Sequence, residues 1–196
     1  MVDLTEMYGE GWCITLAALE AAEALCRMGV KGAASMPDGL DVVTERMEEG
    51  GEEPEVLLLG RDLRGGWCAV LELEGTCGWT GTDPGVLAAL SAGGQTAVSA
   101  YEDPNRIMVQ VAVDGAVVCE LDVVTGRFVP GSTGDQQAVR DLLSVGFSLD
   151  DEASGQAAAT EYSQRAVLAL RAVTGVELME DDFSGPWLGG LSTLGA

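Results

Sequence analysis

The chain has 196 residues, 47% of them hydrophobic and only 5% aromatic, so we expect one domain with a core of valine, leucine and alanine. Its 32 acidic residues against 10 basic ones give a formal net charge of −22. This charge excludes nucleic acids and anionic membranes as expected partners, because phosphate contacts need lysine and arginine. The chain lacks an apolar stretch of about 18 residues and a basic N-terminal region. We therefore expect a cytoplasmic protein without a transmembrane helix or signal peptide.

The first third of the chain predicts alternating strands and helices. Apolar runs of four or five residues indicate strands, and spacing by three and four residues indicates helices. Glycines after such spacing mark helix ends. The predicted elements are a strand at 12–16, a helix at 17–28 that ends at Gly29, a helix from Asp38 or Asp41 to Glu49, and a strand at 56–59.

The stretch at 67–74 is the clearest strand in the sequence, because its residues alternate in character. Trp67, Ala69, Leu71 and Leu73 lie on one face, and Cys68, Val70, Glu72 and Glu74 on the other, which becomes more polar toward the end. One buried and one partly solvated face are typical of an antiparallel sheet. A similar Gly-Trp-Cys segment begins at Gly11. Coincidence and an old duplication explain the pair equally well.

The rest of the chain predicts three strands and three helices. Thr133 and Gln136 have the spacing of a capping box, and the helix that follows would direct Val139, Leu142 and Leu143 inward. The tail at 175–196 would fray unless Trp187 docks it. The predicted elements are a helix at 85–90 after Pro84, a strand at 96–101, strands at 107–113 and 117–123, a helix that ends near Val145, a linker at 150–156 and a helix at 157–173.

The hairpin register follows from the position of the apolar residues. A two-residue turn at Asp114 and Gly115 would place Glu120 opposite Val109, on the apolar face. A three-residue loop, with Gly115 in the left-handed conformation, avoids this carboxylate. We therefore predict the three-residue loop, which pairs Val111 with Val117, Val109 with Cys119 and Ile107 with Leu121.

No catalytic signature is present in the sequence. It has no histidine, so the usual hydrolytic triads and the commonest metal ligand are missing. Its five cysteines are odd in number and lack CxxC spacing, which indicates reduced, mostly buried thiols and no zinc site. We predict no catalytic, cofactor-binding or metal-binding residues. The candidate interaction surface consists of two tryptophans and part of an acidic run: Trp67, Trp79, Glu48, Glu49, Glu52 and Glu53.

The order of several short motifs resembles an actinobacterial, streptomycete-type family of uncharacterised proteins with a domain of unknown function. The resemblance spans nearly the whole chain and implies no activity or site residue. The matching segments are GWCITL at 11–16, GGWCAVLELEG at 65–75, VLAALSAG at 86–93, AVSAYEDPNR at 97–106, VDGAVVCELD at 113–122 and AVTGVEL at 172–178.

These patterns together predict an α+β fold, with an antiparallel sheet of about five or six strands and helices on one face. Residues 1–147 would form the core domain. Residues 148–196 would add a linker, a helix and a tail packed on that core. The leading hypothesis is a non-catalytic acidic protein that binds a basic protein partner, in a regulatory or toxin-neutralising role. The alternative is an enzyme or small-ligand binder that uses carboxylates near Trp67 and Trp79, and a weaker one is an acidic mimic of nucleic acid.

Overall fold

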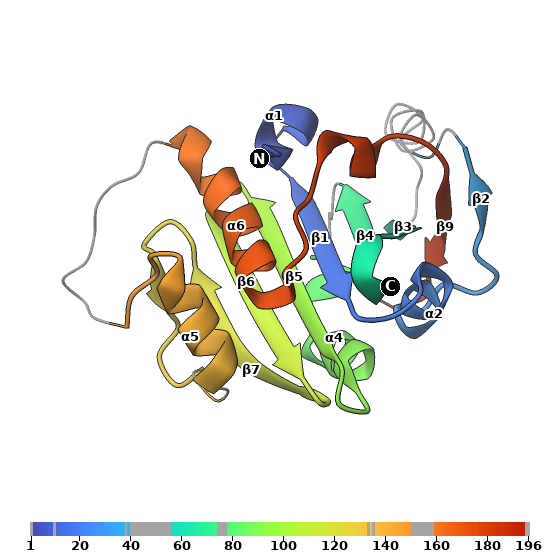
Figure 1. Ribbon diagram of the computed structural model, residues 1–196. Helices are drawn as coiled ribbons and strands as arrows, with labels where there is room; N and C mark the ends of the chain where they lie inside the picture. The colour runs from blue at the N-terminus through green and yellow to red at the C-terminus, as the bar shows by residue number, and fades with distance from the viewer. Residues whose placement is uncertain are drawn as a thin grey trace.

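The structure is a computed structural model that describes residues 2–9, 11–37, 39, 56–73, 78–132, 134, 136–149 and 159–194 (Figure 1). Its described strands form one nine-stranded sheet in the order β2-β9-β3-β4-β1-β5-β6-β7-β8. The strands are β1 Trp12–Ala17, β2 Ala34–Met36, β3 Val56–Asp62, β4 Cys68–Leu73, β5 Thr96–Asp103, β6 Arg106–Val113, β7 Ala116–Asp122, β8 Arg127–Phe128 and β9 Trp187–Ser192. The α-helices are α1 Leu4–Tyr8, α2 Ala21–Arg27, α4 Pro84–Ser91, α5 Gln136–Ser144 and α6 Ala159–Thr174. Short 3-10 helices are η1 Arg64–Gly66, η2 Thr80–Thr82 and η3 Glu180–Phe183.

The centre of the sheet has a βαββαβ topology. Strands β3, β4, β1 and β5 are neighbours, and each neighbouring pair is antiparallel. Helix α2 lies between β1 and β3 in the chain, and α4 lies between β4 and β5. Each helix therefore links two strands of the same direction with one opposite strand between them. This is the split βαβ arrangement of ferredoxin-like folds. Strands β9 and β2 extend it on one side, and β6, β7 and β8 on the other.

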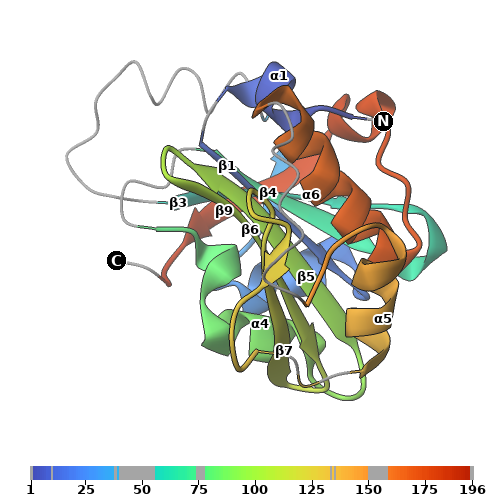
Figure 2. The ribbon, with the colours of Figure 1, turned by 90° about the vertical axis from the view of Figure 1, so that its left-hand side faces the viewer.

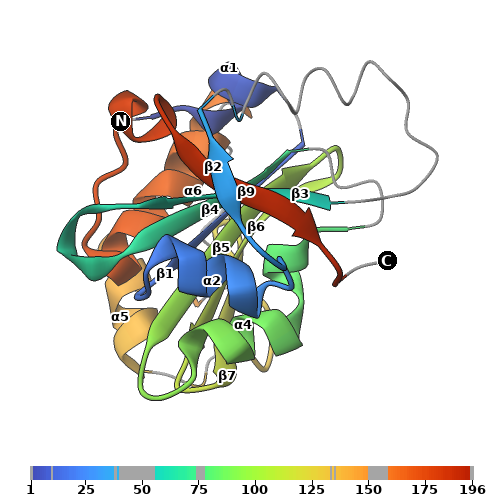
Figure 3. The same cartoon turned by 90° about the vertical axis from the view of Figure 1, so that its right-hand side faces the viewer.

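The prediction of one antiparallel sheet is confirmed, but the predicted number of strands is too low and the helices cover both faces. Helices α2 and α4 lie on one face (Figure 3), and α1, α5 and α6 lie on the other (Figure 2). The reason is that small strand residues on the α2 side, such as Ala17, Cys68 and Ala97, are also buried. Small side chains let a helix approach the sheet closely. The alternation of large and small residues along the strands therefore does not mean that the face with the small residues is exposed.

The two Gly-Trp-Cys segments occupy equivalent places in this core. They begin β1 and β4, which are direct neighbours with Thr15 opposite Val70. Trp12 and Trp67 both pack in the cluster beneath α6. Cys68 lies on the opposite face, under α2 and α4. Each strand leads to a helix on that same face, so the segments are related by an approximate twofold axis between β1 and β4.

The predicted register of the β6–β7 hairpin is wrong by two residues. Asp114 and Gly115 have φ angles of 48° and 82°, so they form a two-residue turn with both angles positive. A β-bulge leaves Val118 without a partner on β6, and Val111 therefore pairs with Cys119. Because the bulge consumes one residue, the apolar residues of both strands still share the buried face. The turn and the apolar pattern are thereby both satisfied.

Two helix predictions need correction. Helix α2 begins at Ala21, not Ala17, because Ala17 is the last residue of β1 and the Asp62 carboxylate accepts the Ala21 N–H at 2.7 Å. Leu143 of α5, predicted to point inward, is 37% exposed, whereas Leu142 beside it is fully buried. Alanine-rich sequence favours helix wherever it occurs, so propensity alone extended α2 too far.

The C-terminal segment is part of the sheet. Strand β9 lies between β2 and β3, and Trp187 at its start is buried in the cluster beneath α6. Trp187 therefore docks the tail. Several predicted features lie outside the described residues, namely the helix ending at Glu49, the acidic residues Glu48, Glu49, Glu52 and Glu53, the capping residue Thr133 and the linker at 150–156.

Candidate functional site

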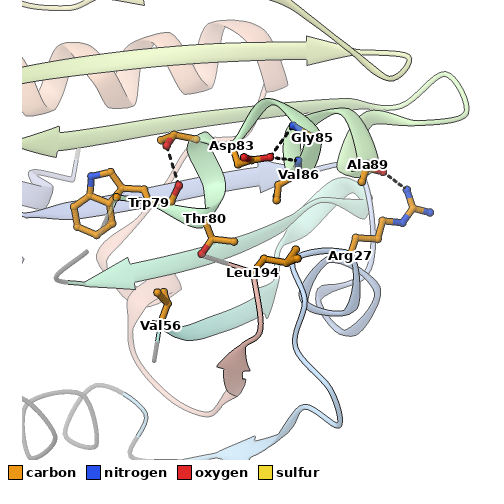
Figure 4. Close-up of a pocket in the computed structure, with 11 residues that line it drawn as sticks. Arg27, Val56, Trp79, Thr80, Asp83, Gly85, Val86, Ala89 and Leu194 are labelled. Carbon is orange, nitrogen blue, oxygen red and sulfur yellow. Dashed lines mark hydrogen bonds between the residues drawn. The ribbon is translucent and has the colours of Figure 1, made fainter. Parts of the chain in front are cut away.

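A pocket of about 630 Å³ opens on the α2–α4 side of the sheet (Figure 4). We call it the Thr80 pocket. Its floor and walls come from η2, from α4, from Arg27 of α2, and from the ends of β3 and the C-terminal segment. The lining residues are Arg27, Val56, Gly78, Trp79, Thr80, Thr82, Asp83, Gly85, Val86, Ala89 and Leu194.

The η2 turn that forms one wall is held by a buried carboxylate. Glu72 of β4 is fully buried, and its two oxygens accept the backbone N–H groups of Thr80 and Gly81, each at 2.7 Å. Burial raises the pKa of the Glu72 carboxyl above its ordinary value, while the N–H groups of Gly81 and Thr80 oppose that rise. The alternating pattern of β4 predicts Glu72 on a face that becomes more polar toward the end of the strand. The structure instead covers it with the turn that follows its strand.

A small polar cluster lies directly beneath the turn. The Thr15 hydroxyl lies 3.2 Å from Ser99 Oγ, and the Cys13 sulfur lies 3.3 Å from the same oxygen. Burial raises the pKa of the Cys13 thiol well above its ordinary value, and the charge of Glu72 adds to the rise. At Gly81 a side chain would overlap Thr15 Oγ1, so the turn can approach this cluster only without a Cβ atom. The η2 turn covers this cluster, and the cluster supports the turn from beneath.

The two tryptophans of the predicted interaction surface lie apart. Trp79 is 9% exposed, lines the Thr80 pocket and packs with Cys13 and Tyr101. Trp67 immediately precedes β4 and packs in the cluster on the opposite face of the sheet. Among the predicted residues that the structure describes, Trp79 alone therefore lines the pocket.

The charged residues at the pocket are engaged within the protein. Arg27 Nε pairs with Glu23 at 2.8 Å, and its Nη1 donates to the Ala89 carbonyl at 2.8 Å. Asp83 caps α4, because its Oδ1 accepts the N–H groups of Gly85 at 2.8 Å and Val86 at 3.0 Å. Contacts within the protein therefore hold both side chains in place.

Thr80 differs from these charged residues. The residue is 6% exposed, and its hydroxyl oxygen is fully buried. Its backbone N–H donates to Glu72, and its side chain lies close enough to that carboxylate to lower the pKa of Glu72. Sequence reasoning missed Thr80, Asp83 and Arg27 as pocket residues. The available signal was a glutamate in an apolar strand, followed eight and nine residues later by Thr80 and Gly81.

Other features of the described residues bear on the site. Cys13, Cys68 and Cys119 are buried, whereas Cys26 is exposed. Burial raises the pKa of Cys68 to about 12. Within the described part of the chain, no three or more cysteine, aspartate or glutamate side chains are grouped so that they could hold a metal ion. No helix found there is long and apolar enough to cross a membrane.

The family of the chain follows from its sequence match. Residues 2–185 match a family described as "Family of unknown function (DUF6461)", and the chain belongs to this family. The match covers both Gly-Trp-Cys strands, the η2 turn and α4. No curated protein and no solved structure matches the chain.

Proposed function

We propose that this protein is a non-catalytic cytoplasmic protein that binds a basic protein partner, in a regulatory or toxin-neutralising role. The observation that carries the proposal is the formal net charge of −22. A surplus of one sign creates a field that steers an oppositely charged partner and raises its association rate.

The arginines of the described residues support this proposal, because several are paired with the protein's own acids. Such exposed pairs add little stability, but each one uses a cation that could otherwise have contacted phosphate. The pairs are Arg27 with Glu23 at 2.8 Å, Arg64 with Asp182 at 2.7 Å, Arg106 with Asp103 at 3.2 Å and Arg171 with Glu177 at 3.0 Å.

Affinity capture followed by kinetics tests the proposal. The full-length chain is immobilised, exposed to a lysate of its source organism at low salt, and each captured protein is then purified separately. We expect a partner with a basic contact face, whose association rate falls as salt shortens the screening length from about 10 Å at 0.1 M toward about 3 Å at 1 M. An association rate independent of salt would contradict the proposal. Displacement of the partner by duplex DNA would favour the nucleic-acid mimic instead.

A second candidate function is the binding of a small ligand, and the Thr80 pocket favours it. The pocket volume of about 630 Å³ lies in the range of about 300–1,000 Å³ found for small-molecule sites. Trp79 contributes an aromatic wall to the pocket. The neighbouring carboxylates of Glu72 and Asp83 already accept backbone N–H groups, which favours binding over acid–base chemistry. Amide chemical-shift titration of the full chain with toluene and benzyl alcohol tests this function. Saturable shifts around Trp79 and Val86 would support it, and no saturable shift with either probe would contradict it.

A further inference from the structure

The walls of the Thr80 pocket are largely apolar. They include four aliphatic side chains and one indole ring, those of Val56, Val86, Ala89, Leu194 and Trp79. Figure 4 shows Val56, Val86 and Leu194 from three separate parts of the chain around one space. Walls of this kind bind the apolar body of a ligand by removing its surface from water.

The Asp83 carboxylate lines this apolar space with part of its bonding capacity unused. Its Oδ1 accepts the N–H groups of Gly85 at 2.8 Å and Val86 at 3.0 Å, so the cap of α4 fixes the side chain in place. Within the part of the chain that the structure describes, Oδ2 accepts no hydrogen bond and the carboxylate makes no ion pair. The start of α4 offsets only about half of a negative charge. A fixed carboxylate with one unused oxygen therefore lines the pocket.

Arg27 also lines the pocket, but its charge is compensated elsewhere. Its Nε pairs with Glu23 at 2.8 Å, and its Nη1 donates to the Ala89 carbonyl at 2.8 Å. Figure 4 shows this contact near the end of α4, whereas Asp83 directly precedes the helix. A rise of about 1.5 Å per residue separates Asp83 from Ala89 by about 9 Å along the helix. Because Glu23 compensates Arg27, the pocket keeps an excess of negative charge at Asp83.

This excess charge favours a cation over a neutral molecule or an anion. Asp83 is exposed, so a cation beside it would keep part of its hydration while an attached apolar body is buried against the walls. Trp79 provides an aromatic ring, which attracts cations as well as apolar groups. The net charge of −22 acts in the same direction, because it attracts cations to the protein and repels anions.

We propose that the Thr80 pocket binds a small organic cation, an ammonium group on a largely apolar body, which Asp83 recognises through its Oδ2 atom. This inference rests on the second candidate function above and names its class of ligand. The buried Glu72 carboxylate supports the site from beneath, because it holds the η2 turn that ends directly before Asp83.

Four probes with the same aromatic ring test the ligand class, namely benzylammonium, benzyl alcohol, toluene and benzoate. Amide chemical-shift titrations of the full chain near neutral pH report both affinity and location. We expect saturable shifts around Trp79 and Val86. Benzylammonium should bind about two- to fivefold more tightly than benzyl alcohol, which is the effect of one partly exposed ion pair. Benzoate should bind most weakly.

The outcomes separate the ligand class from the function on which it rests. If toluene and benzyl alcohol give no saturable shift, the small-ligand function itself is contradicted. If these two probes bind and benzylammonium binds no more tightly than benzyl alcohol, only the cationic class is overturned. Tightest binding of benzoate would overturn that class as well.

Asp83→Asn connects the preference for a cation to the proposed contact. Asparagine still caps a helix but carries no charge. The substitution should remove the preference for benzylammonium and leave the affinity for benzyl alcohol unchanged. Glu6→Gln also removes one negative charge, at an exposed position of α1 on the opposite face of the sheet, and should keep the preference. A preference that survives Asp83→Asn, or that both variants lose equally, would overturn recognition by Asp83.

A matched pair on α4 tests the location. Ala89 lines the pocket and Ala88 does not, although both are partly exposed. Ala89→Phe should abolish saturable binding of benzylammonium, and Ala88→Phe should preserve it. Equal effects of the two substitutions would place the probe outside the pocket and overturn the assignment.

Discussion

Glu72 shows how one buried side chain can organise a surface feature. A carboxylate in the interior loses its hydration, so it persists there only when hydrogen-bond donors surround it. Glu72 meets this requirement with the N–H groups of Thr80 and Gly81. Glu102 has a similar role near α1, where its carboxylate accepts the Trp12 indole N–H at 2.7 Å and the Thr5 hydroxyl. Both carboxylates link strands to the segments that cover them.

The raised pKa of Glu72 predicts a definite pH dependence of stability. A carboxyl whose pKa is higher in the folded state holds its proton more tightly there than in the unfolded chain. Its contribution to the free energy of unfolding is therefore fully present below the unfolded pKa of about 4.3 and is lost as pH rises through the folded pKa.

Substitution of Glu72 tests this sign. Urea denaturation of the wild type and Glu72→Gln, at several pH values from about 5 upward, gives their difference in unfolding free energy. We expect the wild type's advantage over Glu72→Gln to shrink as pH rises. Glu20→Gln, at an exposed position, controls for the loss of one negative charge. A difference that grows with pH would contradict the expected direction.

Gly81 gives a second test at the residue scale. A methyl group there would overlap Thr15 Oγ1 and lie 2.9 Å from Glu72 Oε1. Because both neighbours are buried, Gly81→Ala should lower the free energy of unfolding by about 1–3 kcal/mol. Gly134→Ala is the control, since that position is exposed and its nearest atom would lie 3.5 Å away. Equal stability of the two variants would show that the turn has room to shift.

The β6–β7 hairpin satisfies two local sequence preferences, one for the turn and one for the buried face. The Asp114–Gly115 pair favours a two-residue turn, and the alternating valines favour a common buried face. The bulge at Val118 satisfies both. A bulge is difficult to predict from one sequence because it depends on the fit of the whole strand against its neighbours.

Substitution of Val111 tests the buried face of this hairpin. The residue is fully buried, so Val111→Asp would place an unpaired carboxylate in the core. We expect a loss of roughly 3 kcal/mol or more in unfolding free energy, measured by chemical denaturation. Val124→Asp, at a position 37% exposed, should change stability by less than about 0.5 kcal/mol. A Val111→Asp variant with an unchanged melting temperature would refute the assignment of this face.

Local signals predicted the central strands and α4 well, because the information lies within each segment. Asp83 and Pro84 mark the start of α4, and alternation marks β4 and β6. Long-range pairings could not be predicted in this way. Strand β9 joins β3 from the far end of the chain, with Leu57 opposite Leu191. The Thr80 pocket was also hidden, since it combines short pieces of α2, α4, β3 and the C-terminal segment.

The twofold arrangement of the core bears on the origin of the Gly-Trp-Cys segments. Each begins a strand that leads into a helix on the same face, and the two strands lie side by side with opposite directions. Coincidence of sequence alone would not require equivalent positions in the fold. A duplicated βαβ unit would place the two segments in this way, and so would the internal symmetry of the βαββαβ topology itself. Ala17 of β1 and Glu72 of β4 occupy corresponding positions of the two strands.

At the scale of the whole molecule, acidic charge dominates the electrostatics. The 32 acidic residues exceed the basic ones by 22. Arg61 and Arg64, the closest pair of arginines in the sequence, both contact the segment around η3. Arg61 donates to the Asp182 carbonyl at 3.1 Å, and Arg64 pairs with the Asp182 carboxylate at 2.7 Å. Both arginines tie the C-terminal segment to the sheet, and the Asp182 carboxylate partly neutralises the charge of Arg64.

The charge predicts that the protein does not bind nucleic acid at physiological salt. Each phosphate contact requires a cation near the backbone, and the electrostatic part of nucleic-acid affinity grows with the number of such contacts. We expect no saturable change in fluorescence anisotropy when labelled duplex or single-stranded DNA is titrated with the protein at about 0.15 M salt. Repeating the titration at low salt exaggerates any electrostatic attraction and so makes the test stricter. Arg61→Gln and Arg64→Gln serve as matched variants, because they remove the closest pair of arginines. Saturable binding at physiological salt that these variants weaken would contradict the prediction and locate the nucleic-acid contact near η3.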